Sequence, residues 1–239
     1  MTLNVASHSL RSFSVLAVCA LITSLALADG SETLGDPVGL DLVPGTGYAA
    51  AGTGLSAGQP AGISLSIPPG ARVVQAILYW EGNSATPLDV PATDTIDVNG
   101  TAVTGTFIGG AVGADSGSTQ FLTYRSDITA SGIVQPGNSV LSVSGLDFDQ
   151  NNGAAILAVI DEGGQGAELL LKDGSDRAFI NSAAPMDTTE PQLFTFAAAG
   201  APRTATLVLL FSDVSGRQSG ESDLRPNRIS IWLGNDLGG

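Results

Sequence analysis

Short segments of alternating apolar and polar residues, separated by glycine and proline, are the feature that most limits what this chain can fold into. In residues 63–67 every second side chain is apolar, as in a strand with one buried face, and Pro68-Pro69-Gly70 ends the segment. No stretch combines sustained helical spacing with good helix caps. Roughly ten to twelve such segments with short turns predict an all-β fold, with two packed antiparallel sheets in a jelly-roll or Greek-key arrangement.

Two of these segments carry more detailed predictions. Residues 72–81 (RVVQAILYWE) are partly apolar on both faces, which is typical of a strand near the middle of a sheet. Residues 95–98 and 101–108 flank Asn99-Gly100, a dipeptide whose positive φ angles favour a tight hairpin. The remaining predicted strands are residues 120–129, 139–146, 154–161, 168–172, 192–196, 203–212 and 227–233.

The first 28 residues predict a secretory signal peptide rather than part of the fold. Arg11 precedes a nearly uninterrupted apolar run, and Ala26-Leu27-Ala28 provides the small residues of a cleavage site after Ala28. A retained membrane anchor is the alternative, although the run is short for a span of ~20 residues. A lipoprotein signal at Cys19 is another, but Val18 is bulky for the position before it. We therefore expect a secreted chain, extracellular or periplasmic.

The chain after the signal peptide is expected to form one domain. Residues 29–62 are rich in glycine, alanine and proline and predict an irregular N-terminal segment. Gly52, Gly54 and Gly58 approach a dinucleotide-binding spacing, but Pro60 and Gly62 follow where that motif needs a helix. Residues 63–239 are predicted to form a single β-sandwich domain, because no long linker divides them.

The predicted mature chain lacks the residues on which many enzymes depend. His8 and Cys19, the only histidine and cysteine, both lie in the signal peptide. Without them the chain has no disulfide, no imidazole base for a nucleophile, and no ligands for a typical zinc site. Lys172, the one lysine, precedes Asp173-Gly174 and fits a solvated turn better than a Ser-Lys pair. We therefore expect a protein that is not an enzyme.

The net charge of the chain limits its partners. It is −14 in the full chain, and removal of Arg11 with the signal peptide makes the mature chain one unit more acidic. Such a charge repels nucleic acid and anionic lipid and attracts cations, although it also serves simple solubility outside the cell.

The stretch DFDQNNG is the strongest candidate for a metal site. Asp147, Asp149 and Asn151 have the 1-3-5 spacing of a calcium loop, and oxygen ligands suit calcium. Asn152 and Ala158 stand where an EF-hand needs glycine and glutamate, so any site is of a looser kind, closed by further carboxylates such as Asp161 or Glu162. The alternative is that Asn151-Asn152-Gly153 forms a tight turn and the aspartates face water.

Other carboxylates leave two further readings open. A second possible calcium cluster lies late in the chain and comprises Asp213, Glu221 and Asp223, with Asn227 beside them. Two-carboxylate sugar chemistry needs an acid and a base, which could come from Glu81, Asp147, Asp149, Asp161 and Asp213. Few aromatic side chains are available as sugar platforms, and Trp80 and Trp232 lie in strand patterns that predict core positions.

Three segments resemble a family of secreted bacterial β-sandwich domains of unknown function. They are GARVVQAILYWEG with its Leu78-Tyr79-Trp80, TYRSDIT with Tyr124, Asp127, Ile128 and Thr129, and NNGAAILAVIDE. The resemblance spans roughly residues 60–235, and Asp161 departs from it where an aromatic is common. It implies a β-sandwich on surface or exported proteins, often beside anchors or repeats, and it carries over no catalytic residue.

These observations together predict an exported, non-enzymatic β-sandwich that serves as a surface or extracellular structural or adhesion module. Its partner would be an unknown extracellular protein or glycan, bound by loops at one end of the sandwich, with calcium as a hypothetical stabilising ion. No nucleic-acid partner and no membrane span after signal removal are expected. The alternative is a carbohydrate-binding or carbohydrate-active protein with paired carboxylates.

Overall fold

The strands of the folded chain follow the alternating segments of the sequence. The computed structural model describes residues 26–27, 33–84, 93–112, 119–179, 182–197, 204–214 and 229–231. Its strands are β1 (Ala26–Leu27), β2 (Gly47–Gly54), β3 (Ala61–Ile67), β4 (Arg72–Ser84), β5 (Thr95–Val98), β6 (Thr101–Thr104), β7 (Thr106–Val112), β8 (Gln120–Asp127), β9 (Gly137–Ser144) and β10 (Gln150–Asp161). One turn of 3₁₀-helix, η2 (Thr129–Ser131), is the helical element of these residues.

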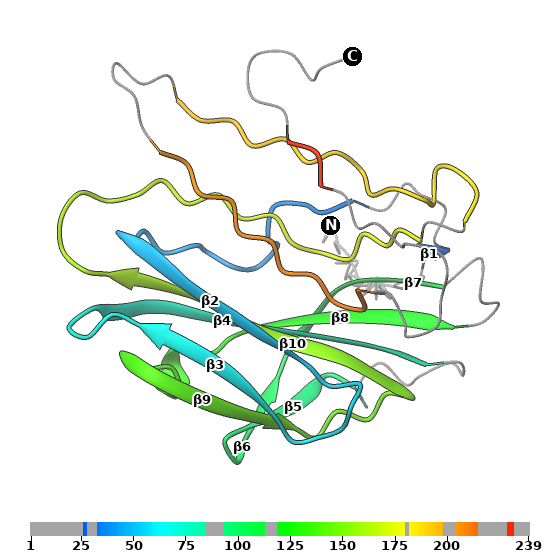
Figure 1. The fold of residues 1–239 in the computed structure, drawn as a ribbon, viewed down its shortest axis with the longest axis horizontal. Coiled ribbons are helices and arrows are strands. Elements are labelled where there is room, and N and C mark those ends of the chain that lie inside the picture. Colours follow the sequence, from blue (N-terminus) through cyan, green and yellow to red (C-terminus); the bar gives the residue numbers. More distant parts are fainter. Residues whose placement is uncertain are drawn as a thin grey trace, which may run out of the picture.

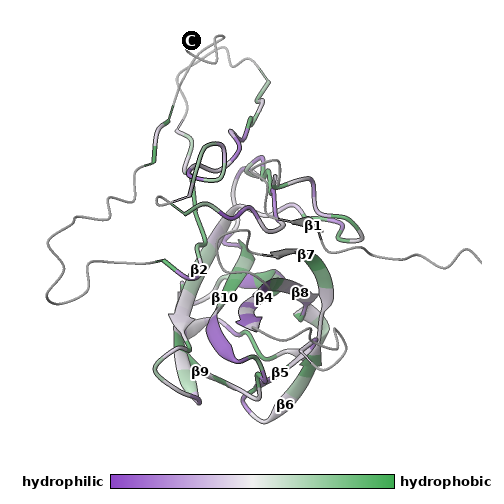
Figure 2. Cartoon of the chain, turned by 90° about the vertical axis from the view of Figure 1, so that its right-hand side faces the viewer, coloured by the Kyte–Doolittle hydropathy of each residue, from purple (hydrophilic) through white to green (hydrophobic). Residues whose placement is uncertain are grey.

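The strands form two facing sheets, which confirms the prediction of an all-β sandwich (Figures 1 and 2). The six-stranded sheet has the order β1-β7-β8-β4-β10-β2 and the four-stranded sheet the order β3-β9-β5-β6. All pairings are antiparallel except that of β1 with β7. The described residues thus hold nine antiparallel strands, fewer than predicted, and β4 lies between β8 and β10 as its two apolar faces indicated.

The Asn99-Gly100 hairpin between β5 and β6 is confirmed. Asn99 has a φ of 52° and Gly100 a φ of 80°, the positive values that this turn requires. The predicted strand 101–108 is divided at Gly105, however, because β6 belongs to the four-stranded sheet and β7 to the six-stranded sheet. The chain therefore changes layer at Gly105.

The core between the sheets is built around Trp80 and Tyr124. These rings are stacked with centroids 5.6 Å apart, and each is at most 1% exposed. Trp80 Nε1 donates a hydrogen bond to the carbonyl oxygen of Thr93 (3.1 Å), and Tyr124 Oη lies 2.7 Å from the Thr93 hydroxyl. Isoleucine, leucine and valine side chains from both sheets surround the pair. The predicted core position of Trp80 is confirmed, whereas Trp232 lies outside the described residues.

Several strand predictions are wrong. The segment 29–62 is not irregular throughout, because it contains β2 and the start of β3. The strand predicted to end at residue 108 continues to Val112 in β7. Residues 168–172, 192–196 and 204–212 form no strand in the structure, and only residues 229–231 of the last predicted strand are described. Apolar alternation alone did not reveal that these late segments have no ladder partner among the described residues.

The late segments lie on the outer side of the six-stranded sheet, away from the four-stranded sheet (Figures 1 and 2). Residues 33–46 also cross this outer face, where Gly35 pairs with Asp173 and Gly45 with Ala167 through isolated bridges. β1 pairs with Ala111 and Val112 of β7 and lies within the predicted signal peptide, so cleavage after Ala28 would remove it.

Substitution of Gly105 tests the packing at the layer change. A Cβ atom at this position would overlap the Trp80 ring and lie 3.0 Å from the carbonyl oxygen of Arg125. We expect Gly105→Ala to lower the free energy of unfolding by about 1–3 kcal/mol in urea denaturation. Gly35→Ala is the control, because no atom lies within 4 Å of a Cβ there. Equal stability of the two variants would contradict this packing.

Candidate functional site

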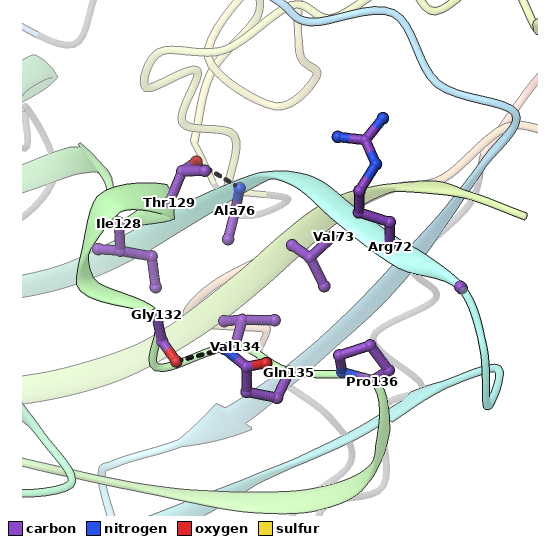
Figure 3. A pocket seen from close by; sticks show the side chains of 10 residues that line it. Arg72, Val73, Ala76, Ile128, Thr129, Gly132, Val134, Gln135 and Pro136 are labelled. Carbon is purple, nitrogen blue, oxygen red and sulfur yellow. Dashed lines mark hydrogen bonds between the residues drawn. The ribbon is translucent and has the colours of Figure 1, made fainter.

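A hollow at one end of the sandwich offers little chemistry. It has a volume of about 280 Å³ and lies between the start of β4 and the loop after η2 (Figure 3). Val73, Ile128 and Val134 give it an apolar wall, while the Arg72 side chain points away from it and pairs with Asp161 at 3.0 Å. The hydrogen bonds at its rim, such as Ala76 N to Thr129 Oγ1 (2.9 Å), are internal to the fold. The hollow lacks convergent polar groups of the kind that orient a ligand.

The polar side chains that could take part in binding or catalysis lie instead on the outer face of β4 and its neighbours. Alternation places Gln75, Tyr79 and Glu81 on this face while Ala76, Leu78 and Trp80 enter the core. Gln75 is 2% exposed, accepts a hydrogen bond from Val43 N (2.8 Å), and donates to the carbonyl oxygen of Asp41 (3.0 Å). Gln75 therefore holds the segment that contains Asp41 and Val43 against this part of the outer face.

A buried ion pair fixes the next part of the outer face. Arg125 of β8 contacts Asp173 at 2.6 Å, and the two side chains are only 4% and 10% exposed. Tyr79 donates a hydrogen bond to the same carboxylate (3.1 Å), and Arg125 also donates to the carbonyl oxygen of Val38. Burial and the adjacent Asp173 charge raise the pKa of Tyr79 far above its ordinary value, so its hydroxyl stays protonated.

The ion pair also explains where two covering segments cross. Asp173 and Gly35 exchange two backbone hydrogen bonds of 2.9 Å, and the carbonyl oxygen of Val38 accepts a hydrogen bond from the Arg125 guanidinium. A hollow of about 360 Å³ lies beside this crossing and is lined by Thr33, Phe107 and their neighbours. We call Arg125, Asp173 and Tyr79 the latch, because together they join residues 33–38 and 173–175 to the sheet.

Removal of the Asp173 carboxylate tests the latch. Asp173→Ala leaves the Arg125 guanidinium buried without its counter-ion, so we expect unfolding to become easier by about 3–5 kcal/mol. Asp36→Ala is the matched control, because Asp36 pairs with Lys172 at 3.5 Å and its side chain is 94% exposed. That variant should change stability by less than about 0.5 kcal/mol. Both variants are measured by chemical denaturation, and equal losses in the free energy of unfolding would contradict the role of the latch.

A second polar group surrounds Glu81, and a β-bulge creates it. Asn151 is paired with Gly82 and Gly153 with Glu81, so Asn152 is an extra residue in β10 opposite β4. The bulge brings Asn152 Nδ2 to Glu81 Oε1 at 3.3 Å, and Asn152 is 7% exposed. Ser212 lies beside Gly153, since its Oγ is 3.7 Å from a Cβ placed there.

Asp213 and Arg177 complete this group, which we call the Glu81 cluster: Glu81, Asn152, Arg177, Ser212 and Asp213. Burial raises the pKa of Glu81 to about 7; contacts with Asn152 and Ser212 and the Arg177 charge lower it, while the Asp213 charge raises it. Burial likewise raises the pKa of Asp213, and Arg177 opposes that shift. The Arg177 guanidinium lies over the Phe121 ring, 4.4 Å from its centroid. The cluster thus contains two carboxyl groups with raised pKa values and one positively charged guanidinium.

The raised pKa of Glu81 predicts how stability depends on pH. Glu81 ionises near pH 4.5 in the unfolded chain and near pH 7 in the folded chain, so the folded protein loses stability as pH rises through this window. Glu81→Gln should match the wild type near pH 4.5 and exceed it by up to about 3 kcal/mol above pH 7.5. Urea midpoints measured in EDTA across this range check the difference. The exposed Glu168→Gln serves as control, and a constant gap between wild type and Glu81→Gln would contradict the assignment.

The DFDQNNG stretch is not the tight turn that one sequence interpretation favoured. Asn151, Asn152 and Gly153 lie inside β10, and the bend precedes them at Phe148 and Asp149. Asn151 Oδ1 accepts a hydrogen bond from Phe148 N (3.2 Å), and Asp149 Oδ2 accepts one from the Ser84 hydroxyl. Asp147 is exposed. Two of the three predicted ligands thus already contact protein donors, and calcium at this loop stays a prediction.

The other predicted residues separate into those that the structure brings together and those that it does not. Glu81 and Asp213, both candidates for two-carboxylate sugar chemistry, share the Glu81 cluster, and Asp213 is also a candidate ligand of the second calcium cluster. Asp161 pairs with Arg72 at a distance from them in the sheet, and Glu221 and Asp223 lie outside the described residues. In the part of the chain that is described, no three histidine, cysteine or carboxylate side chains converge as metal ligands. Nor do these residues contain a helix that is long and apolar enough to cross a membrane.

Sequence reasoning missed Asn152, Ser212 and Arg177. The sequence predicts for Asn152 either a misfit in a calcium loop or a place in a tight turn, and the bulge that turns it toward Glu81 depends on a register that no local pattern reveals. Ser212 follows an apolar run and Arg177 follows a turn, and neither carries a motif.

Comparisons with known proteins identify no relatives for these features. No protein-family model matches the chain. No curated protein and no solved structure gives a match either.

Proposed function

We propose that this chain is an exported β-sandwich module with a structural or adhesive role outside the cytoplasm, and that it is not an enzyme. The observation that carries the proposal is how the chain uses its polar side chains. Gln75, Tyr79 and Arg125 bind the chain's own covering segments, and their partners are internal backbone and carboxylate groups. A sandwich that is packed inside and covered on one outer face is suited to bearing contacts through its loops.

The apolar N-terminal run and the acidic composition support export. A net charge of −14 favours solubility without disulfides and disfavours binding to anionic lipid or nucleic acid. Its core supplies stability by burial, as seen around the stacked Trp80 and Tyr124. Such a module would meet an extracellular protein or a glycan at its exposed loops, including the one with Asp147.

A carbohydrate-binding or carbohydrate-active protein is the second candidate, and the pairing of Glu81 with Asp213 favours it. A carboxyl group with a pKa of about 7 beside a second carboxylate is the kind of pair used for acid-base hydrolysis of sugars. Trp80 gives this reading no support, because a ring that is 1% exposed cannot stack on a sugar. A glycan-array or hydrolysis signal that disappears in both Glu81→Gln and Asp213→Asn would establish it, and the absence of any signal in the wild type would reject it.

Export is tested by expression of the complete coding sequence in a bacterial host. Mass spectrometry of the periplasmic or extracellular fraction should find a product that begins at Asp29, because cleavage is expected after Ala28. Leu21→Arg, which places a charge in the apolar run, should retain the uncleaved chain in the cytoplasm. A wild-type chain that stays cytoplasmic with residues 1–28 attached would refute the proposal.

A further inference from the structure

The Glu81 cluster contains a buried oxygen atom that the described protein groups do not satisfy. Asn152 is more than nine-tenths buried, and its Oδ1 has no hydrogen-bond partner among the described residues although its Nδ2 contacts Glu81. Ser212 Oγ, in the same cluster, is also buried, and its contact with Glu81 lowers the pKa of that carboxyl group. A buried acceptor without a donor costs on the order of 1–3 kcal/mol, so the arrangement favours an external group that accepts its lone pairs.

The charges of the cluster point to a positive group. Glu81 and Asp213 provide two carboxylates, and Arg177 provides one positive charge. The Arg177 guanidinium is directed onto the Phe121 ring, and Phe121 is 6% exposed. With both carboxylates ionised the five side chains carry a net negative charge, which a bound cation would neutralise.

We infer that the Glu81 cluster is a binding site for a divalent cation, Ca²⁺, with Glu81, Asp213, Asn152 Oδ1 and Ser212 Oγ as its protein ligands. All four are hard oxygen donors, the set that calcium takes in its flexible coordination. Magnesium requires a smaller, near-octahedral arrangement and dehydrates reluctantly, and zinc favours nitrogen and sulfur ligands that this cluster lacks. Two carboxylates with two neutral oxygens suggest a dissociation constant of roughly 10⁻⁴–10⁻³ M, the range of extracellular calcium modules.

The position of this site explains what a cation would do for the fold. Glu81 belongs to the central strand β4 and Asn152 to the bulge of β10, whereas Ser212 and Asp213 end the late segment 204–214. A cation at the cluster would therefore join that segment to the sheet, as the latch joins residues 33–38. The inference rests on the proposed export only in its choice of calcium, which is abundant outside cells.

Calcium titration of the purified full chain tests the site. We expect CaCl₂ in the millimolar range to raise the melting temperature at pH 7.5, and MgCl₂ at the same ionic strength to have a much smaller effect. Glu81→Gln and Asp213→Asn, which preserve shape, should each weaken calcium binding by at least tenfold in isothermal titration calorimetry. Asn152→Ala, which removes one neutral ligand, should weaken it by a smaller factor.

The control is Asp147→Asn, which removes one exposed carboxylate from the DFDQNNG loop and should leave the calcium response unchanged. NaCl at matched ionic strength shows how much of any shift is simple screening of the acidic chain. An equal response to NaCl, an unaltered calcium affinity in Glu81→Gln, or a loss of affinity in Asp147→Asn would each overturn the inference. None of these results bears on where the product is cleaved, so the failure of this site and the failure of the proposed export are distinguishable.

Discussion

The buried pair of Arg125 and Asp173 is the interaction on which the arrangement of the outer face depends. A six-stranded sheet whose central strand is polar on one side must either leave that side in water or cover it with groups that satisfy most of its buried polar atoms. The chain covers it, and the 2.6 Å contact with its Tyr79 hydrogen bond meets the cost of burying the two charges. The crossing of residues 33–38 with 173–175 follows from that contact, because both segments supply its partners.

The inner side of β4 is apolar and packs into the core. Ala76, Leu78 and Trp80 pack against the four-stranded sheet, and the glycines around them allow close approach: Gly82 lies against Phe148 and Gly105 against Trp80. One strand thus carries apolar packing on one face and hydrogen-bonded polar anchors on the other. A domain without disulfides can be held in this way, since core burial stabilises the sandwich and the anchors determine how the covering segments lie across it.

The sequence predicts those parts of the fold that depend on local patterns. Alternation identified β3, β4, β8, β9 and β10, and Asn99-Gly100 identified its hairpin, because side-chain period and turn conformation are properties of a few adjacent residues. It could not reveal that residues 101–108 divide between two sheets at Gly105, nor that 168–172 and 204–212 form no ladder among the described residues. These outcomes depend on partners distant in the sequence. The Glu81 cluster shows the same limit: Glu81 and Asp213 were recognisable as carboxylates, but only the extra residue in β10 brings Asn152 to them.

The bulge at Asn152 connects the fold with the proposed cation site. A regular β10 would keep every residue opposite one residue of β4 and would leave a strand asparagine free to point to solvent. The extra residue instead buries its carboxamide, a costly placement unless both ends of the amide are satisfied. Asn152 Nδ2 donates a hydrogen bond to Glu81, whereas Oδ1 has no hydrogen-bond partner among the described residues. A cation between that oxygen and the two carboxylates would satisfy the amide, reduce the cost of ionising Glu81, and fix the end of segment 204–214 at the centre of the sheet.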